Sequence, residues 1–127
     1  TLEKDLAADG WAVLRTDVTT NTTVSGVRNI IIGQYQSDPT NVKAVYIVGH
    51  LAVPYSGNIA PDGHDSHQGA WPCDGYYGEM NGNWTDNSVS VQASQNPKNF
   101  NVPGDGKFSW VGLICMICPR SVQAKWS

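Results

Sequence analysis

The sequence has few charged residues, and its middle has no basic ones. Lysine, arginine, aspartate and glutamate make up 15% of the 127 residues, against roughly 25% in an average soluble domain. No lysine or arginine occurs in residues 44–97. A nucleic-acid interface needs clustered basic side chains that contact phosphates, so we expect no nucleic-acid partner. The same stretch contains the acidic residues Asp62, Asp65, Asp74, Glu79 and Asp86.

Two kinds of apolar segment are also missing. No run of about 18 apolar residues occurs, so we expect no membrane span. The chain starts at Thr1 without a methionine, and no basic segment followed by an apolar one marks a signal peptide. We expect this chain to be a fragment of a longer protein.

Cysteine is scarce, and its count is odd. Three cysteines exclude a framework in which every thiol is paired. Cys115 and Cys118 form a C-x-x-C pair within an apolar run, which suits a redox site or half of a zinc site. No second C-x-x-C accompanies the pair. We therefore favour buried thiols without a chemical role.

The first half of the chain predicts alternating helices and strands. Apolar residues at helical spacing predict a helix from Leu2 that stops at Gly10, and a second from Val24 that ends at Asp38-Pro39. Residues 11–14 predict a strand. Residues 42–48 are nearly continuous in apolar character, which is typical of a strand buried on both faces of a parallel sheet. This order predicts an α/β fold with a parallel-sheet layer and flanking helices.

Beyond the strand predicted at 42–48, glycine, aspartate and aromatic residues replace any regular period. Residues 50–87 predict one long loop, and a loop of this length usually has a function. It follows the carboxyl end of the central strand, where open α/β sheets bind their ligands. Residues 88–91 alternate and predict a short strand, and 96–106 predict another loop.

A set of short motifs follows in order along this central segment, 42–86. Together they resemble the amino-terminal subdomain of the gingipain-like cysteine peptidases, a bacterial family with a caspase-like fold. The resemblance covers about residues 2–108, and two inserted motifs resemble an environmental branch of the family. The motifs are Val48-Gly49-His50, Val53-Pro54-Tyr55-Ser56-Gly57, Asp74-Gly75-Tyr76-Tyr77-Gly78 and Asn81-Gly82-Asn83-Trp84-Thr85-Asp86, and the insertions are Pro61-Asp62-Gly63-His64 and His67-Gln68-Gly69-Ala70-Trp71-Pro72.

The resemblance implies a secreted or cell-surface parent enzyme that hydrolyses peptide bonds through a histidine-activated cysteine thiolate. In the family the catalytic histidine lies in a later Gly-His-Gly element, and the cysteine follows it. His50 is preceded by Gly49 but followed by Leu51. No residue here matches the catalytic pair. We expect the chain to support the downstream catalytic subdomain of the same parent and to be inactive alone.

The last residues depart from the family. We divide the chain into a partial amino-terminal subdomain, residues 1–108, and a divergent tail, residues 109–127. An apolar, cysteine-containing composition begins where the resemblance ends. Our hypothesis is that this tail is translated out of frame, in place of a strand bearing a Val-Gly-Arg element.

The acidic loop offers three competing sites, and no cofactor is certain. Calcium suits its hard oxygens, although such side chains commonly cap turns instead. Zinc would use His64 and His67 in an H-x-x-H pair. A Cys73–histidine nucleophile is disfavoured, because nearby acids oppose the thiolate. The calcium candidates are Asp62, Asp65, Asp74, Asp86 and Asn81.

Aromatic residues of the same loop also allow two interpretations. Trp71, Tyr76, Tyr77 and Trp84 could stack on a ligand, or they could form a small core beneath the loop. The second is the commoner arrangement. A ligand bound through Trp71 and Trp84 would suit the alternative function, a calcium-dependent extracellular binding or structural module without catalysis.

Overall fold

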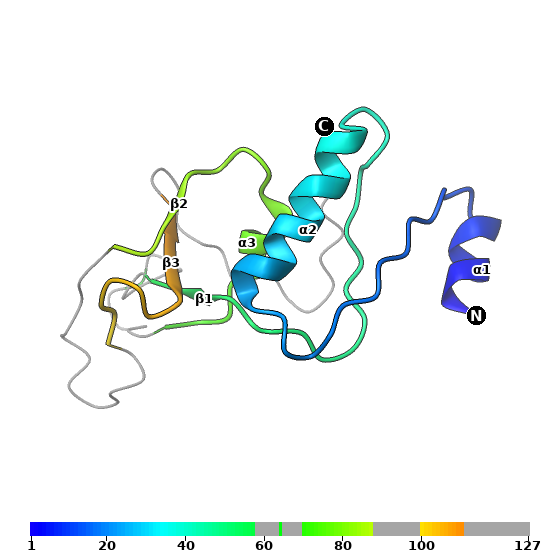
Figure 1. The fold of residues 1–127 in the computed structure, drawn as a ribbon. Helices are drawn as coiled ribbons and strands as arrows, with labels where there is room; N and C mark the ends of the chain where they lie inside the picture. Colours follow the sequence, from blue (N-terminus) through cyan, green and yellow to red (C-terminus); the bar gives the residue numbers. More distant parts are fainter. Residues whose placement is uncertain (58–63, 65–69, 88–99, 111–127) are drawn as a thin grey trace.

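The computed structural model describes residues 1–57, 64, 70–87 and 100–110 (Figure 1). Two helices come first in the described residues, and short strands follow with a third helix between the first two strands. Helix α1 lies at the opposite end of the molecule from the sheet in this view. The elements are α1 (Leu2–Ala8), α2 (Val24–Ser37), β1 (Tyr55–Ser56), α3 (Gly75–Gly78), β2 (Trp84–Thr85) and β3 (Lys107–Trp110).

Helices α1 and α2 lie where the sequence predicts them, because local signals define their ends. Gly10, just beyond α1, has a φ of 91°, which residues with a Cβ rarely adopt. The Thr23 hydroxyl accepts a hydrogen bond from the Gly26 amide at 3.1 Å and caps the start of α2. Helix α2 ends at Ser37, directly before Asp38 and Pro39.

The described sheet is mixed, and β3 is its central strand. β1 pairs with β3 in parallel, with Tyr55 opposite Lys107, whereas β2 pairs with it antiparallel, with Trp84 opposite Trp110. The other edge of β1 is bonded to the segment before α3, since the Ser56 amide donates to the Trp71 oxygen at 2.7 Å. The fold is therefore α/β in a broad sense, with a mixed sheet.

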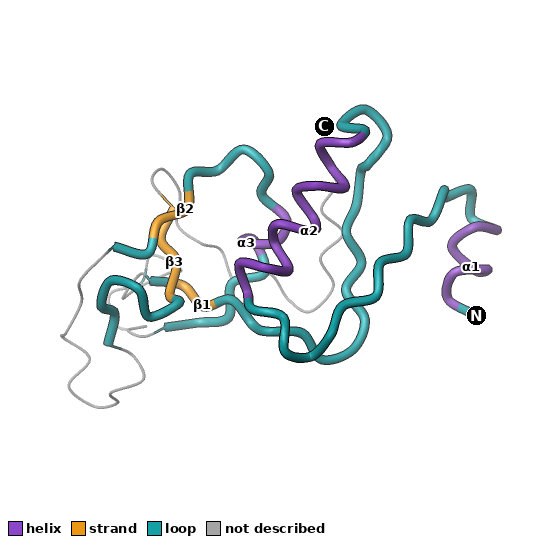
Figure 2. Tube along the Cα trace, viewed as in Figure 1, coloured by secondary structure: helices purple, strands orange, loops and turns teal. Residues whose placement is uncertain are grey.

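The strands predicted at 11–14 and 42–48 are not strands in the structure. Both segments run as irregular chain (Figure 2), and side chains such as Leu14, Tyr46 and Val48 are 64%, 65% and 68% exposed. β-branched and aromatic residues favour extended backbone, but a strand also needs a neighbour that completes its hydrogen bonds and covers its side chains. The predicted parallel layer is thus not seen in the described residues.

The segment predicted as one long loop contains short regular elements. β1, α3 and β2 all lie within residues 50–87. Elements of two to four residues are too short to give a hydrophobic period, so the sequence does not reveal them. The strand predicted at 88–91 lies outside the described residues.

The core lies between α2 and the sheet, with α3 in its centre. Its buried members are Val27 of α2 and Tyr76 and Tyr77 of α3. The partly buried residues packed against this core are Val18, Val24, Ile31, Leu51, Trp84 and Phe108.

Among the helices of the described residues, none has the length and apolar character that a membrane span requires.

Candidate functional site

Tyr76 is the centre of an aromatic cluster that consists of Tyr76, Tyr77, Trp84 and Phe108. Its ring stacks on Phe108 with centroids 4.1 Å apart and an interplanar angle of 23°. Trp84 meets it edge-on at 5.3 Å and 75°. Both are favourable aromatic geometries. Tyr76 and Tyr77 are only 5% and 3% exposed, so the prediction of a small core beneath the loop is correct for them.

Arg28 of α2 holds the end of α3. Its Nε donates to the Tyr76 main-chain oxygen at 2.9 Å, and its Nη2 donates to the Glu79 oxygen at 3.0 Å. The guanidinium carbon also lies 5.0 Å from the centroid of the Tyr76 ring. The last carbonyl groups of a helix lack partners within it and favour a nearby cation. Arg28 supplies hydrogen-bond donors and a positive charge to these carbonyl groups, and it adds a cation–π contact with Tyr76.

The Tyr77 hydroxyl is a hydrogen-bond donor and not a proton-transfer group at neutral pH. It donates to the Ala52 main-chain oxygen at 2.6 Å. Burial raises the pKa of Tyr77 to about 12, and the neighbouring Tyr76 and Asp74 add to the effect. The proton therefore stays on Tyr77, and the bond ties α3 to the segment before β1.

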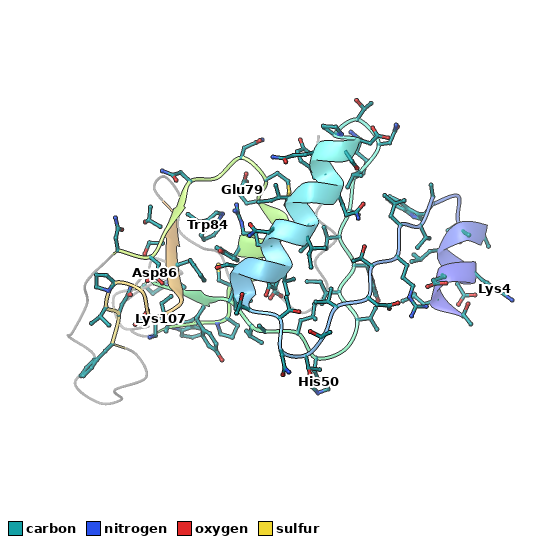
Figure 3. The ribbon with its side chains drawn as sticks, viewed as in Figure 1. Lys4, His50, Glu79, Trp84, Asp86 and Lys107 are labelled. Carbon is teal, nitrogen blue, oxygen red and sulfur yellow. The ribbon has the colours of Figure 1, made fainter. Side chains whose placement is uncertain are left out.

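Asp86 follows directly after β2, and its side chain holds the turn at residues 102–107 that leads into β3 (Figure 3). Its two carboxylate oxygens accept the Gly104 amide at 3.2 Å and the Gly106 amide at 2.8 Å. Both glycines have positive φ, 86° and 81°, so glycine is required for this path. This is the turn-holding role that short acidic side chains commonly have.

Asp105 strengthens the same turn from within. Its carboxylate accepts the Val102 amide at 3.0 Å and the Lys107 ammonium at 2.7 Å. Burial opposes ionisation of Asp105, but the hydrogen bonds from Lys107 and Val102 and the charge of Lys107 outweigh it, so the pKa of Asp105 lies below its usual value.

The described residues do not assemble the predicted calcium site. Asp62 and Asp65 lie outside them, and the oxygens of Asp86 already accept amides. Asn81 is bonded through its main-chain amide to Glu79 Oε1 at 2.6 Å. Asp74 starts α3 without a side-chain capping bond. Within the described ranges no three His, Cys, Asp or Glu residues are grouped to hold a metal ion.

The structure leaves the zinc alternative untested and excludes Cys73 as a free nucleophile in this state. His64 is exposed, while His67 lies outside the described residues, so their pairing stays a prediction. Cys73 is 1% exposed and disulfide-bonded, and it is therefore no free thiolate. Figure 3 places exposed His50 beyond the start of α2, away from Glu79 and Trp84. The pair Cys115 and Cys118 lies outside the described part.

Sequence reasoning missed Arg28, and it did not show which turn Asp86 holds. Arg28 acts on α3 across 48 residues, and no local pattern signals such a contact. The turn had a signal, because Gly104 and Gly106 flank Asp105, and closely spaced glycines often mark backbone with positive φ.

No family model matches this chain, and the comparisons with curated proteins and with solved structures give no match either.

Proposed function

We propose that this chain is the amino-terminal, non-catalytic subdomain of a gingipain-like cysteine peptidase. In the parent it supports the downstream catalytic subdomain, which hydrolyses peptide bonds. The motifs Asp74–Gly78 and Asn81–Asp86 carry the proposal, since they resemble those of the family. Their side chains serve internal contacts, the aromatic cluster and the turn held by Asp86, as a supporting role requires.

The placement of the candidate nucleophile and base supports inactivity of the chain alone. Cys73 is buried in a disulfide, and His50 lies exposed on an irregular segment. Nucleophilic catalysis needs a thiolate and a base within hydrogen-bond reach of one another. Disulfides persist in oxidising compartments, which supports the secreted or cell-surface location proposed for the parent.

The gene downstream of codon 108 tests the proposed family. We expect one reading frame to encode a Val-Gly-Arg-type strand, then a Gly-His-Gly element and a cysteine. Absence of these elements from all three frames would remove the proposal. If the frame of this chain itself encodes them beyond residue 127, the family stands and only the out-of-frame hypothesis for residues 109–127 fails.

A cleavage assay tests the inactivity of the chain by itself. The purified chain is incubated with a fluorogenic peptide library, with and without a thiol reductant that opens the Cys73 disulfide. We expect no turnover in either condition, for wild type and for Cys73→Ala alike. Reductant-dependent turnover that Cys73→Ala abolishes would show that the chain is an enzyme in its own right.

The alternative function, a calcium-dependent binding or structural module, is distinguished by thermal melting. Bound calcium would stabilise the folded state by mass action and raise the melting temperature. Since the Asp86 carboxylate already accepts hydrogen bonds from two main-chain amides, we expect millimolar calcium to leave the melting temperature unchanged. A calcium-induced rise in the melting temperature would favour the calcium-dependent module if chelator reverses it and if the double variant Asp62→Asn, Asp65→Asn lacks it.

A further inference from the structure

Asn81 and Gly82 form the one Asn-Gly step of the sequence, and in the fold Gly82 is partly exposed. Helix α3 ends at Gly78 and β2 begins at Trp84, so the pair lies in a bend between them. The Asn81 side chain is exposed. The hydrogen bonds of the described residues hold neither the Asn81 side-chain amide nor the Gly82 main-chain amide.

We propose that Asn81 is a site of spontaneous deamidation. The main-chain nitrogen of Gly82 loses its proton and attacks Cγ of Asn81. As the new N–Cγ bond forms, the bond between Cγ and Nδ2 breaks, and Nδ2 takes up a proton and leaves as ammonia. Water then opens the cyclic imide at one of its two carbonyl carbons, giving aspartate or isoaspartate. Water is the only co-reactant. Glycine has no Cβ to obstruct the attack, and its backbone reaches conformations that other residues avoid.

The two ends of this connection are fixed, which gives the modification a structural effect. On one side the Glu79 oxygen accepts Arg28 Nη2 at 3.0 Å, and on the other Trp84 lies against Tyr76 at 5.3 Å. Isoaspartate inserts an additional carbon into the main chain between these anchors. It also adds a negative charge beside Glu79. We expect the contact of Arg28 with α3 and the aromatic cluster to loosen as the protein ages.

Neighbouring asparagines provide internal controls. Asn83 is also exposed but is followed by Trp84, and Asn101 is 1% exposed and followed by Val102. The same chemistry is slower at both, because a side chain on the following residue crowds the attack. The inference concerns this chain alone and does not depend on the proposed peptidase family.

Peptide mapping of the aged protein tests the proposal. The folded chain is held at mildly alkaline pH, cleaved after Glu79, and analysed by chromatography with mass spectrometry. We expect the peptide that begins at Met80 to become an acid and to separate into two isomers, with Asn81 and not Asn83 as the changed residue. Retention of the Asn81 amide in the folded chain, over a time in which the urea-unfolded chain converts, would overturn the proposal.

Two variants separate the chemistry from general instability. Gly82 does not have positive φ, so Gly82→Ala fits the backbone, and we expect it to slow conversion about tenfold, equivalent to about 1.4 kcal/mol in the barrier. Asn81→Asp should give no isoaspartate under the same conditions. An unchanged rate in Gly82→Ala would contradict the attack by the Gly82 nitrogen.

Discussion

Arg28 and Tyr76 are joined twice across 48 residues, by a hydrogen bond of 2.9 Å to the main chain and by a cation–π contact of 5.0 Å to the ring. The hydrogen bond satisfies the end of α3, and the ring contact places the charge over the core. A single side chain of α2 therefore fixes both the backbone and the side chain of the same residue.

Replacement of Arg28 by lysine should destabilise the fold although the charge is kept. Lysine has no planar fork with which to reach two carbonyl groups and a ring face. We expect a loss of about 1–3 kcal/mol, measured by urea unfolding, since two partly buried carbonyl groups lose their donors. Arg15→Lys is the matched control, because Arg15 is exposed and bonds only surface carboxylates, and it should change little. Equal effects of the two variants would contradict the role of Arg28.

Tyr77→Phe should change stability in a pH-dependent way. At neutral pH the variant loses the bond to Ala52, at a cost of about 1 kcal/mol. In the wild type the raised pKa means that, from pH 10 to about pH 12, the unfolded state loses the Tyr77 proton while the folded state keeps it. Stability is therefore complete below pH 10 and falls above it, by about 1–2 kcal/mol in this interval. Urea unfolding of both proteins across this range should show the additional alkaline loss in the wild type alone.

Asp86→Asn should release the turn at residues 102–107. The carboxylate accepts the Gly104 and Gly106 amides on two different oxygens. Asparagine replaces one of these oxygens with an NH2 donor, so one main-chain amide would face another donor. We expect a loss of about 1–3 kcal/mol and faster hydrogen exchange of the Gly106 amide, whereas the Gly104 amide also donates to the Asp86 main-chain oxygen at 3.2 Å, which the variant keeps. Asp17→Asn, at an exposed carboxylate bonded to Arg15, serves as control and should leave exchange in the turn unchanged. Slow exchange in Asp86→Asn would count against the assigned role.

A pair of glycine substitutions should have opposite signs. A Cβ at Gly57 would lie 2.5 Å from Ser109 Oγ and 2.9 Å from the Lys107 oxygen, so we expect Gly57→Ala to cost about 1–3 kcal/mol through overpacking. Gly33 lies within α2 and has nothing within 4 Å of the same position. Gly33→Ala should therefore stabilise the fold by about 0.5–1 kcal/mol. Thermal unfolding of both variants measures the two opposite changes in stability. A lower melting temperature for Gly33→Ala would contradict the open space found beside Gly33.

Helices α1 and α2 were predictable from sequence because their signals are local. The capping hydroxyl of Thr23 and the glycine at position 10 lie within a few residues of the ends they mark. The strands depend on partners instead. Residues 42–48 have strong strand propensity and yet remain unpaired in the described structure, whereas Tyr55 and Ser56 pair because β3 lies beside them.

The candidate site was predictable to the extent that its residues act on near neighbours. An acidic loop suggested either metal binding or turn-holding, and Asp86 adopts the second role. The choice depended on the Gly104 and Gly106 amides, 18 and 20 residues away, and composition alone does not bring these groups together. For Tyr76 and Tyr77 the motif indicated burial correctly, since paired tyrosines in a glycine-flanked turn suit a small core.

The central position of β3 has a consequence for how the chain folds during synthesis. β1 and β2 both pair with β3, although β3 is the last of the three along the chain and Tyr55 is matched with Lys107. Neither pairing can form until residues 107–110 have left the ribosome. Pairings so distant in sequence require closure of long loops before they contribute stability, which slows folding. Until then Tyr76 lacks the stacking contact with Phe108 that completes the aromatic cluster, and this interval is when the chain is most open to aggregation.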